Sequence, residues 1–504
     1  MAVNETKKRK RLRIKPGVIT WLLLAVMNLV FAFFVYRFPL VPKKWKHIIL
    51  AGLAILAAVL AFFSFKKNRK GSKTAVSVIN VLISICLLFA SLFLPQLTGR
   101  IESVFAEYPD NLEVTMNVYA LKTEYKSAHS DVFRAKGVSM ITSTSLDDYK
   151  NKQFIAQSAV DQDNQSWAMD QLKSYFNTDS LWENRTSSVW SAIEALYNAE
   201  GDALVLNAAY ADLIVDDSQY SSFKEDTVIL KSFTRNVNND SSKKKLDSDQ
   251  PFAVLIAGSD SREAQLTPMT RTDVDIVAVV NPGEKTILLI SLPRDTYMEN
   301  PVLDNGMDKL THMGVYGVDN TTAALAKFFD YEELDKYILV NFNTYSKIVN
   351  TLNGVDIVNP YAFTGGGYNF AAGNIHLSGD EALAYVRERK SLANGDFDRN
   401  EHQVIVLKAL LKKMLSREIL TSFSAVLDSL KGTFLTNLST ESIFELVSDQ
   451  IDSVGSWNIV SRHMDGSTGS AETASMPGQL LSVVYPDETI KDAIRDEMME
   501  LLDK

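Results

Sequence analysis

Three long apolar runs dominate the first hundred positions of the chain. They span residues 17–36, 47–65 and 74–94, and none of them contains Asp, Glu, Lys or Arg. Each run has about the 20 residues that a helix needs to cross a bilayer core. A cleaved signal peptide would explain only the first run, and a buried core helix would explain any one run alone. Three runs in succession therefore predict three transmembrane helices within residues 1–95.

Basic residues flank these runs unevenly. Seven precede the first run, four lie between the first and second, and five lie between the second and third. The tail and the second loop share one side of the membrane, so twelve basic residues oppose four. Because Lys and Arg are enriched on the cytoplasmic side, we expect a multi-pass protein with a cytoplasmic N-terminus. The large portion after residue 95 is then extracellular.

Beyond the spans, the pattern becomes that of mixed α/β structure. Residues 114–119 and 204–207 are typical of strands, and residues 188–198 of a helix, so we interpret residues 96–235 as an accessory domain. Residues 236–250, NVNNDSSKKKLDSDQ, are polar and lack apolar periodicity. They predict a linker.

The next segment alternates short apolar strands with helices, which predicts an α/β domain over residues 251–418. Its predicted strands are 252–257, 276–280, 286–290, 337–340 and 355–358, and its predicted helices include 321–329 and 344–352. The glycine-rich FTGGGYNFAAG, residues 363–373, lacks a Walker lysine and is expected to be a flexible connection. Residues 419–504 form a C-terminal extension, with predicted helices at 419–430, 440–451 and 488–502 and a strand at 457–462.

Charge narrows the class of partner. Residues 1–73 hold 16 Lys/Arg and one acidic residue, whereas the remainder holds 36 Lys/Arg against 60 Asp/Glu, a net charge of −24. An acidic body binds nucleic acid poorly, so no nucleic-acid partner is expected. Cys86 is the only cysteine, and the six histidines show no zinc-binding spacing, which disfavours a zinc hydrolase.

Acidic and arginine residues gather where the predicted strands begin or end. The set comprises Asp260, Arg262, Arg271, Asp273, Asp275, Arg294 and Asp295. Clefts form at strand ends in α/β sheets. Carboxylates bind Mg²⁺ and guanidinium groups fork onto phosphate oxygens, so this pattern favours a site for metal and phosphate. Surface salt bridges at strand ends remain an alternative.

A second group lies further along. In GDEALAYVRER, Arg387 and Arg389 are two apart and reach one ligand only if the helix ends between them. Arg399, His402 and Gln403 are spaced i, i+3 and i+4, which predicts one face in the first turns of another helix. Backbone N–H groups at such a position also favour an anion.

Six motifs, in order, resemble the LytR-CpsA-Psr (LCP) family over residues 252–415: AGSDSR, TRTD, SLPRDT, KLTH, GDEALAYVRER and DFDRNEHQ. The three spans and the middle domain are similar to its CpsA-like, capsule-associated branch. The resemblance implies an α-β-α three-layer domain with a pocket for a prenyl lipid. It also implies transfer of a glycopolymer, here capsular polysaccharide, from an undecaprenyl-pyrophosphate carrier to a peptidoglycan acceptor.

The resemblance also implies roles for individual residues. Asp260 and Asp273 would hold Mg²⁺, either of them being a candidate to accept the acceptor's proton, and Arg294 would contact the reacting phosphate. The pyrophosphate head group would be bound by Arg271, Arg294, Arg387, Arg389, Arg399 and Gln403. His402 departs from the family pattern, which often has Arg before this Gln, so one head-group contact is missing or depends on pH.

Two other functions stay open. A membrane-bound transcriptional regulator would need a DNA-binding face in the cytoplasm, where only the basic tail and second loop are available. A non-catalytic binder of lipid-linked polymer would keep the arginines without turnover.

Overall fold

The computed structural model describes residues 16–66, 70–105, 111–136, 143–158, 161–215, 219–238, 244–259, 266–416, 425–426, 428–429, 434–452 and 457–503. The chain forms two compact units. The first comprises Met1–Ala106 with Thr440–Val454, and the second comprises Glu107–Ser439 with Gly455–Lys504.

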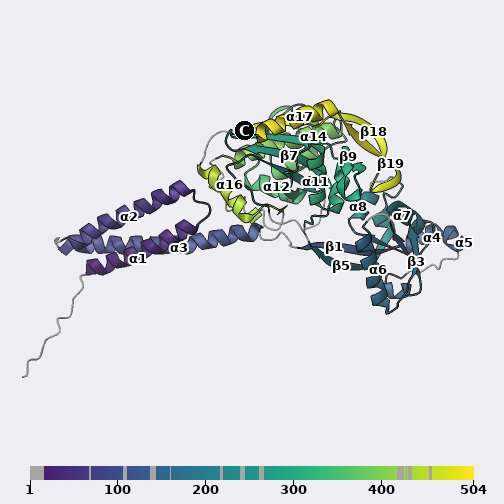
Figure 1. Cartoon of the computed structure of the whole chain (residues 1–504), viewed down its shortest axis with the longest axis horizontal. Helices are drawn as coiled ribbons and strands as arrows, with labels where there is room; N and C mark the ends of the chain where they lie inside the picture. Colours follow the sequence, from purple (N-terminus) through teal and green to yellow (C-terminus); the bar gives the residue numbers. More distant parts are fainter. Residues whose placement is uncertain are drawn as a thin grey trace, which may run out of the picture. The chain divides into compact units, whose positions relative to one another are not determined.

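The first unit contains the three predicted spans. They are the helices α1 (Pro16–Arg37), α2 (Lys43–Phe65) and α3 (Lys70–Phe105), which lie side by side in Figure 1. All three are long and apolar enough to cross a membrane, and most of their side chains face outward. The same unit includes the amphipathic helix α16 (Thr440–Asp452).

Polar contacts join the three helices at one end. Asn80 of α3 is fully buried and donates to Ser64 of α2 at 3.2 Å and to Thr20 of α1 at 3.4 Å. These residues lie near the start of α1, the end of α2 and the start of α3, which an up-down-up arrangement requires. In lipid such bonds hold helices together, because an unpaired amide has no water to replace its partner.

The second unit begins with the accessory domain, a five-stranded sheet in the order β3-β2-β4-β1-β5. Its strands are β1 (Asn111–Leu121), β2 (Gln153–Gln157), β3 (Trp182–Thr186), β4 (Ala203–Asn207) and β5 (Thr227–Asn238). Its helices are α4 (Thr123–Ala128), α5 (Ser130–Ala135), α6 (Gln162–Phe176), α7 (Val189–Tyr197), α8 (Tyr210–Ile214) and α9 (Phe223–Asp226). The longest two, α6 and α7, pack into separate clusters on the two faces of the sheet.

The strands predicted at 114–119 and 204–207 and the helix predicted at 188–198 are present, whereas the first three residues of the predicted linker, 236–238, belong to β5. β5 continues to Asn238 because its last residues pair with Asn111 to Glu113 of β1, a backbone pairing that needs no apolar side chains.

The second domain is built on a six-stranded sheet in the order β16-β11-β6-β7-β8-β17. The strands are β6 (Phe252–Ser259), β7 (Thr272–Asn281), β8 (Thr286–Leu292), β11 (Tyr337–Asn341), β16 (Phe434–Thr436) and β17 (Asn458–His463). β6 and β8 are antiparallel to β7, while β11 is parallel to β6 and β17 is parallel to β8. One edge therefore collects the ends of β6, β8, β11 and β17 and the start of β7. Of the six strands, β16 and β17 come from the segment predicted as a C-terminal extension, residues 419–504.

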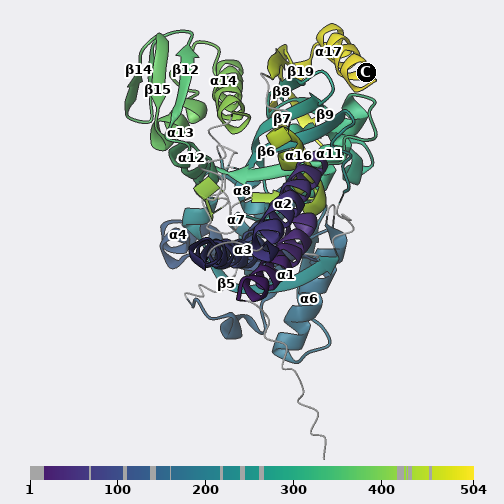
Figure 2. The same cartoon turned by 90° about the vertical axis from the view of Figure 1, so that its left-hand side faces the viewer.

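Helices cover both faces of this sheet. Leu288 and Ile290 pack in one buried core with α10 (Leu310–Met313), α11 (Val318–Phe328) and α17 (Glu488–Leu502). On β17, Val460 packs against this core, whereas the next residue, Ser461, faces the other way and is reached by Lys408 of α14 (Asp396–Met414). Figure 2 shows α14 and α17 on opposite sides of β7 and β8. This is the predicted three-layer α/β arrangement.

Smaller elements extend the sheet domain. They are β9 (Tyr297–Asn300), β10 (Gly306–Lys309), η3 (Gly314–Tyr316), α12 (Phe342–Thr351), β12 (Val355–Asn359), β13 (Phe363–Gly365), β14 (Tyr368–Phe370), β15 (Gly373–Leu377), α13 (Gly379–Arg387), β18 (Gly466–Thr473) and β19 (Met476–Pro486). The glycine-rich segment expected to be a flexible connection instead forms the hairpin β13–β14. Gly366 and Gly367 supply its turn with positive φ angles, which other residues adopt rarely.

Candidate active site

An ion pair between Asp273 and Arg294 lies at the centre of the candidate site. Asp273 is the second residue of β7, and Arg294 follows the end of β8 at the same edge of the sheet. Arg294 Nη1 donates to Asp273 Oδ1 at 2.7 Å, with the side chains 16% and 15% exposed. A partly exposed pair of this kind can exchange its mutual contact for contact with a ligand.

Three of the predicted arginines act on this one carboxylate. Burial alone would raise the pKa of Asp273, but the guanidinium groups of Arg294, Arg399 and Arg271 together hold it below its ordinary value. Arg271 and Arg399 are themselves 5% and 6% exposed. The sequence places these residues up to 128 positions apart, and the fold gathers them around Asp273. Their shared positive field suits a phosphate.

Arg399 belongs to the first turn of α14 and has a partner that the sequence reasoning missed. Its Nη2 atom lies 2.5 Å from Asp396 Oδ1, one turn earlier in the same helix. Burial raises the pKa of Asp396; Arg399, Arg294 and Arg389 oppose that rise. The i, i+3 spacing of Asp and Arg at a helix start was the available signal.

Arg387 and Arg389 lie where α13 ends. Arg387 is its last residue, and Glu388 has extended backbone angles, so the chain leaves the helix between the two arginines, as the shared-ligand prediction requires. Arg389 is exposed and interacts electrostatically with Asp396 and Arg399. Arg387 is also exposed. Arg389 therefore interacts by charge with the arginine cluster, which consists of Arg271, Arg294 and Arg399 around Asp273. The role of Arg387 stays a prediction.

Two residues of the KLTH motif contact Arg294 and the neighbouring Asp295. Lys309 Nζ pairs with Asp295 Oδ1 at 2.9 Å, and the backbone N–H of Thr311 donates to the carbonyl of Arg294 at 2.9 Å. Burial favours a raised pKa for Asp295, but Lys309 and then Arg294 outweigh it and lower that pKa. The side chain of Asp295 and the backbone of Arg294 are thus both held in place by the KLTH motif.

Asp275 is a second carboxylate that sequence reasoning left without a role. It is 1% exposed and accepts from Thr272 Oγ1 at 3.0 Å. Burial is the main reason that its pKa rises to about 7, and the nearby Asp273 adds to the rise. The pKa values of Asp273 and Asp275 therefore shift in opposite directions although the two residues are only two positions apart.

His402 lies in a buried, aromatic setting. Its ring is fully buried, stacks on Phe363 with centroids 4.8 Å apart, and lies 4.3 Å from the ring of Tyr385. Burial lowers its pKa to about 4, so the imidazole is neutral at physiological pH. Gln403, the next residue, is 6% exposed and donates to the carbonyl of Val386 at 3.4 Å. The pH-dependent head-group contact considered for His402 stays a prediction, which this buried aromatic setting does not favour.

Asp273 fits the role of a Mg²⁺ ligand, because its carboxylate is held ionised and oxygen atoms are the ligands that Mg²⁺ prefers. Asp260, its expected partner, lies outside the described residues, as does Arg262. Within the described ranges, no group of three or more His, Cys, Asp or Glu side chains could hold a metal. The magnesium site remains a prediction.

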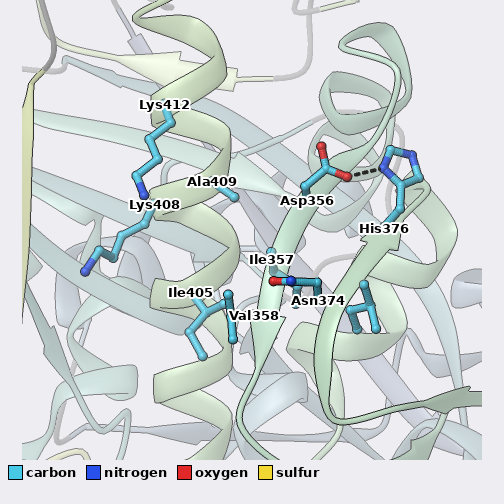
Figure 3. A pocket seen from close by; sticks show the side chains of 10 residues that line it. Asp356, Ile357, Val358, Asn374, His376, Ile405, Lys408, Ala409 and Lys412 are labelled. Carbon is cyan, nitrogen blue, oxygen red and sulfur yellow. Dashed lines mark hydrogen bonds and ion pairs between the residues drawn. The ribbon is translucent and has the colours of Figure 1, made fainter.

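A groove of about 560 Å³ lies elsewhere on α14, between that helix and the strands β12 and β15. Figure 3 shows Ile405 and Val358 facing each other across it, with the ion pair between Asp356 of β12 and His376 of β15 on the side of the strands. Lys408 and Lys412 also line it. None of its lining residues belongs to the arginine cluster, so the expected prenyl cavity beside Arg294 also remains a prediction.

Comparisons with known proteins converge on one family. The family model described as "LytR_cpsA_psr family" matches residues 217–485. The polyisoprenyl-teichoic acid–peptidoglycan teichoic acid transferase TagU of Halalkalibacterium halodurans is 37% identical over 206 residues, which are 40% of this chain and 66% of the relative. The TagU of Bacillus cereus strain AH820 is 36% identical over 214 residues, 42% of this chain and 69% of the relative. The crystal structure of B. subtilis TagV is 27% identical with a TM-score of 0.43, covering 51% of this chain and 98% of that one.

Proposed function

This chain belongs to the LytR_cpsA_psr family, and we propose that it is a membrane-anchored enzyme that transfers a lipid-linked glycopolymer onto peptidoglycan. The TagU relatives are named as transferases of teichoic acid between a polyisoprenyl carrier and peptidoglycan. The observation that carries the proposal is the convergence of Arg294, Arg399 and Arg271 on the ionised Asp273 at one sheet edge.

The reaction replaces one phosphorus–oxygen bond by another. An acceptor hydroxyl on peptidoglycan attacks the phosphorus that carries the polymer, and the bond to the bridging oxygen breaks. The lipid monophosphate leaves with that electron pair, and the acceptor's proton is released. Such a transfer needs alignment and charge neutralisation more than covalent chemistry from the protein.

The residues of the cluster supply those needs. Arg294, Arg271 and Arg399 lie in a mostly buried setting, where charge–charge interactions are stronger than in water. Arg389 is exposed and interacts by charge with Arg399, which supports a role for it in binding the same ligand. Asp273 is a weak base because its pKa is low, which argues against it as the acceptor of the proton. A Mg²⁺ ion held by Asp273 would add charge neutralisation at the phosphate oxygens.

The proposed location is the outer face of the cytoplasmic membrane. Three helices suited to span a membrane precede the second unit, and the basic residues around them favour a cytoplasmic N-terminus. A reporter enzyme that is active only outside the cell should therefore be active when fused after Leu94. Protection of the region beyond residue 95 from protease added to intact protoplasts would contradict this topology.

We further propose an undecaprenyl carrier and capsular polysaccharide as the cargo, which the resemblance to the CpsA-like branch supports. The TagU relatives point instead to teichoic acid as the polymer. Deletion of the gene separates the two: loss of wall-bound capsule, with capsule shed into the medium, is expected. Unchanged capsule together with loss of wall teichoic acid would overturn the cargo assignment while leaving the reaction intact.

The direct test uses the full-length chain in lipid nanodiscs with a prenyl-pyrophosphate-linked oligosaccharide and peptidoglycan fragments. We expect release of prenyl monophosphate that stops with EDTA and returns with Mg²⁺. Tight donor binding without release would support a non-catalytic binder instead. Absence of both binding and release would remove the transferase proposal and revive the regulator, whose test is specific DNA binding by the intact chain.

A further inference from the structure

The accessory domain packs directly against the segment that follows the KLTH motif. A single buried cluster contains Tyr210 and Ile214 of α8 together with Val315 of η3 and Met476 of β19. Within it, Tyr210 Oη donates to Tyr316 Oη at 3.1 Å, and the two rings meet edge to face. Tyr210 is 1% exposed, so this hydrogen bond forms away from water. The two domains thus share a core and a specific polar contact.

Backbone contacts connect η3, the turn that contains Tyr316, to the TRTD motif. The carbonyl of Gly314, at the start of η3, accepts from the backbone N–H of Thr270 at 2.9 Å. A Cβ at Gly314 would lie 2.2 Å from the carbonyl oxygen of Thr270, so the two segments are as close as their backbones permit. Thr270 is also bonded to Ser259 at the end of β6 and directly precedes Arg271. The position of η3 therefore constrains the start of β7.

A second set of contacts that holds Arg294 centres on Asp308, which is completely buried. Its carboxylate accepts from Asn300 at 3.0 Å, from Ser475 at 2.9 Å and from the backbone N–H of Lys309 at 2.9 Å, and it pairs with His312 at 2.8 Å. This network fixes residues 308–312. These residues in turn hold Asp295 through Lys309 and the carbonyl of Arg294 through Thr311.

Charge also links the two domains. Burial raises the pKa of both Tyr210 and Tyr316, and the carboxylates of Asp161 in the accessory domain and Asp308 in the sheet domain add to the rise. Both phenols therefore stay protonated, and their hydrogen bond is present across the physiological pH range.

We propose that the accessory domain positions the catalytic arginine cluster, with Tyr210 as the positioning residue that holds η3 through Tyr316. The inference rests on the proposed transferase function. It assigns the accessory domain a part in catalysis although its residues lie outside the arginine cluster.

The test compares Tyr210→Phe, Tyr316→Phe and the double variant in the full-length chain, each lacking only hydroxyl groups. Tyr175→Phe is the matched control, because its hydroxyl bonds Asp147 on the exposed side of the same domain. We expect kcat to fall about threefold to tenfold in each single variant with KM for the lipid-linked donor unchanged. The double variant should lose no more than the worse single one, because both remove the same bond.

Additive losses in the double variant, or unchanged kcat in folded single variants, would overturn the proposal. Hydrogen exchange provides a readout that does not need turnover. Amides of residues 308–316 and 270–273 should exchange faster in Tyr210→Phe than in Tyr175→Phe. Equal exchange in the two variants would contradict the positioning role even if the chain proves not to be a transferase. Faster exchange in Tyr210→Phe, together with no turnover by the wild type, would contradict only the proposed function.

Discussion

At the scale of single residues, the guanidinium of Arg294 determines the protonation state of the carboxylate at the centre of the candidate site. By pairing with Asp273 it keeps that carboxylate ionised, which favours metal binding and disfavours proton uptake. It remains 16% exposed at the sheet edge, within reach of a phosphate. The proposed function would therefore give this one planar group two roles, pairing with Asp273 and binding phosphate.

Arg294→Ala should reduce transfer by about 100-fold or more, because a charge that acts on the reacting phosphate is lost. Arg294→Lys should restore little, since a point charge cannot reproduce the bidentate fork. Turnover of the prenyl-pyrophosphate donor is the measurement. Arg185→Ala, which removes an exposed arginine paired with Glu183 in the accessory domain, is the control. Wild-type turnover in Arg294→Ala would remove this residue from the site.

The pKa of Asp275, raised to about 7 by burial, predicts a pH-dependent cost in stability. An unfolded Asp titrates near pH 4. Between the two values the folded state binds more protons, so stability falls as pH rises from about 4 to 7. Asp275→Asn should therefore raise the free energy of unfolding by about 1–4 kcal/mol at pH 8, with the gain vanishing near pH 4. Thermal unfolding at several pH values tests this, and a gain independent of pH would contradict it.

Much of the cluster could be predicted from the sequence, because Arg271, Asp273 and Arg294 lie beside apolar strands whose ends share an edge. The ion pair itself could not. Pairing Asp273 with Arg294 depends on the antiparallel register of β7 and β8, which places Asp275 opposite Leu292. Asp396 was missed for a similar reason, since its carboxylate acquires significance only beside Arg399, Arg294 and Arg389 in the folded chain.

At the scale of elements, α14 combines two unlike environments. Its first turn presents Arg399 to the ionic cluster, whereas His402, three residues later, lies among the rings of Phe363 and Tyr385. Helical spacing predicted that Arg399 and His402 lie on one face of the helix. It could not predict that aromatic rings cover this face at His402. The aromatic rings come from β13 and α13, and the glycine-rich sequence around β13 gave no sign of an ordered hairpin.

The buried imidazole of His402 predicts acid sensitivity. Its pKa is about 4 in the folded state, below the ordinary value near 6.5, so the unfolded state binds more protons in between. Stability is therefore fully present above about pH 6.5 and is lost as pH falls toward 4. His402→Phe keeps an aromatic ring and should remove up to about 3 kcal/mol of this pH dependence. Chemical unfolding at pH 4.5 and 7.5 is the measurement, and an unchanged difference between the two would contradict it.

At the scale of the whole molecule, the catalytic domain is discontinuous in sequence. The resemblance to the family ends by residue 415, yet β17 pairs with β8 and α17 packs in the same buried core as β6, β7 and β8. Local periodicity predicted the strand and the helix correctly. It could not place them, because the pairing of Asn458 with Thr286 joins residues that local patterns do not relate.

A chain ending at residue 456 should therefore lose its folded sheet domain. β17 pairs along β8 from Thr286 to Ser291, all but the last residue of that strand. From α17, Ile494, Met498 and Leu501 fill the core, and burying three such side chains contributes roughly 5 kcal/mol. That is as large as the net stability of many domains, about 5–15 kcal/mol.

The matched control lacks residues 1–106, which belong to the other compact unit, and should keep a cooperative thermal transition. Near-ultraviolet circular dichroism and limited proteolysis compare the two. The chain ending at residue 456 should show no cooperative transition and rapid cleavage within residues 252–415. A transition within a few degrees of the control would mean that the six motifs fold without β17 and α17, and would restore the shorter catalytic domain that the motifs alone define.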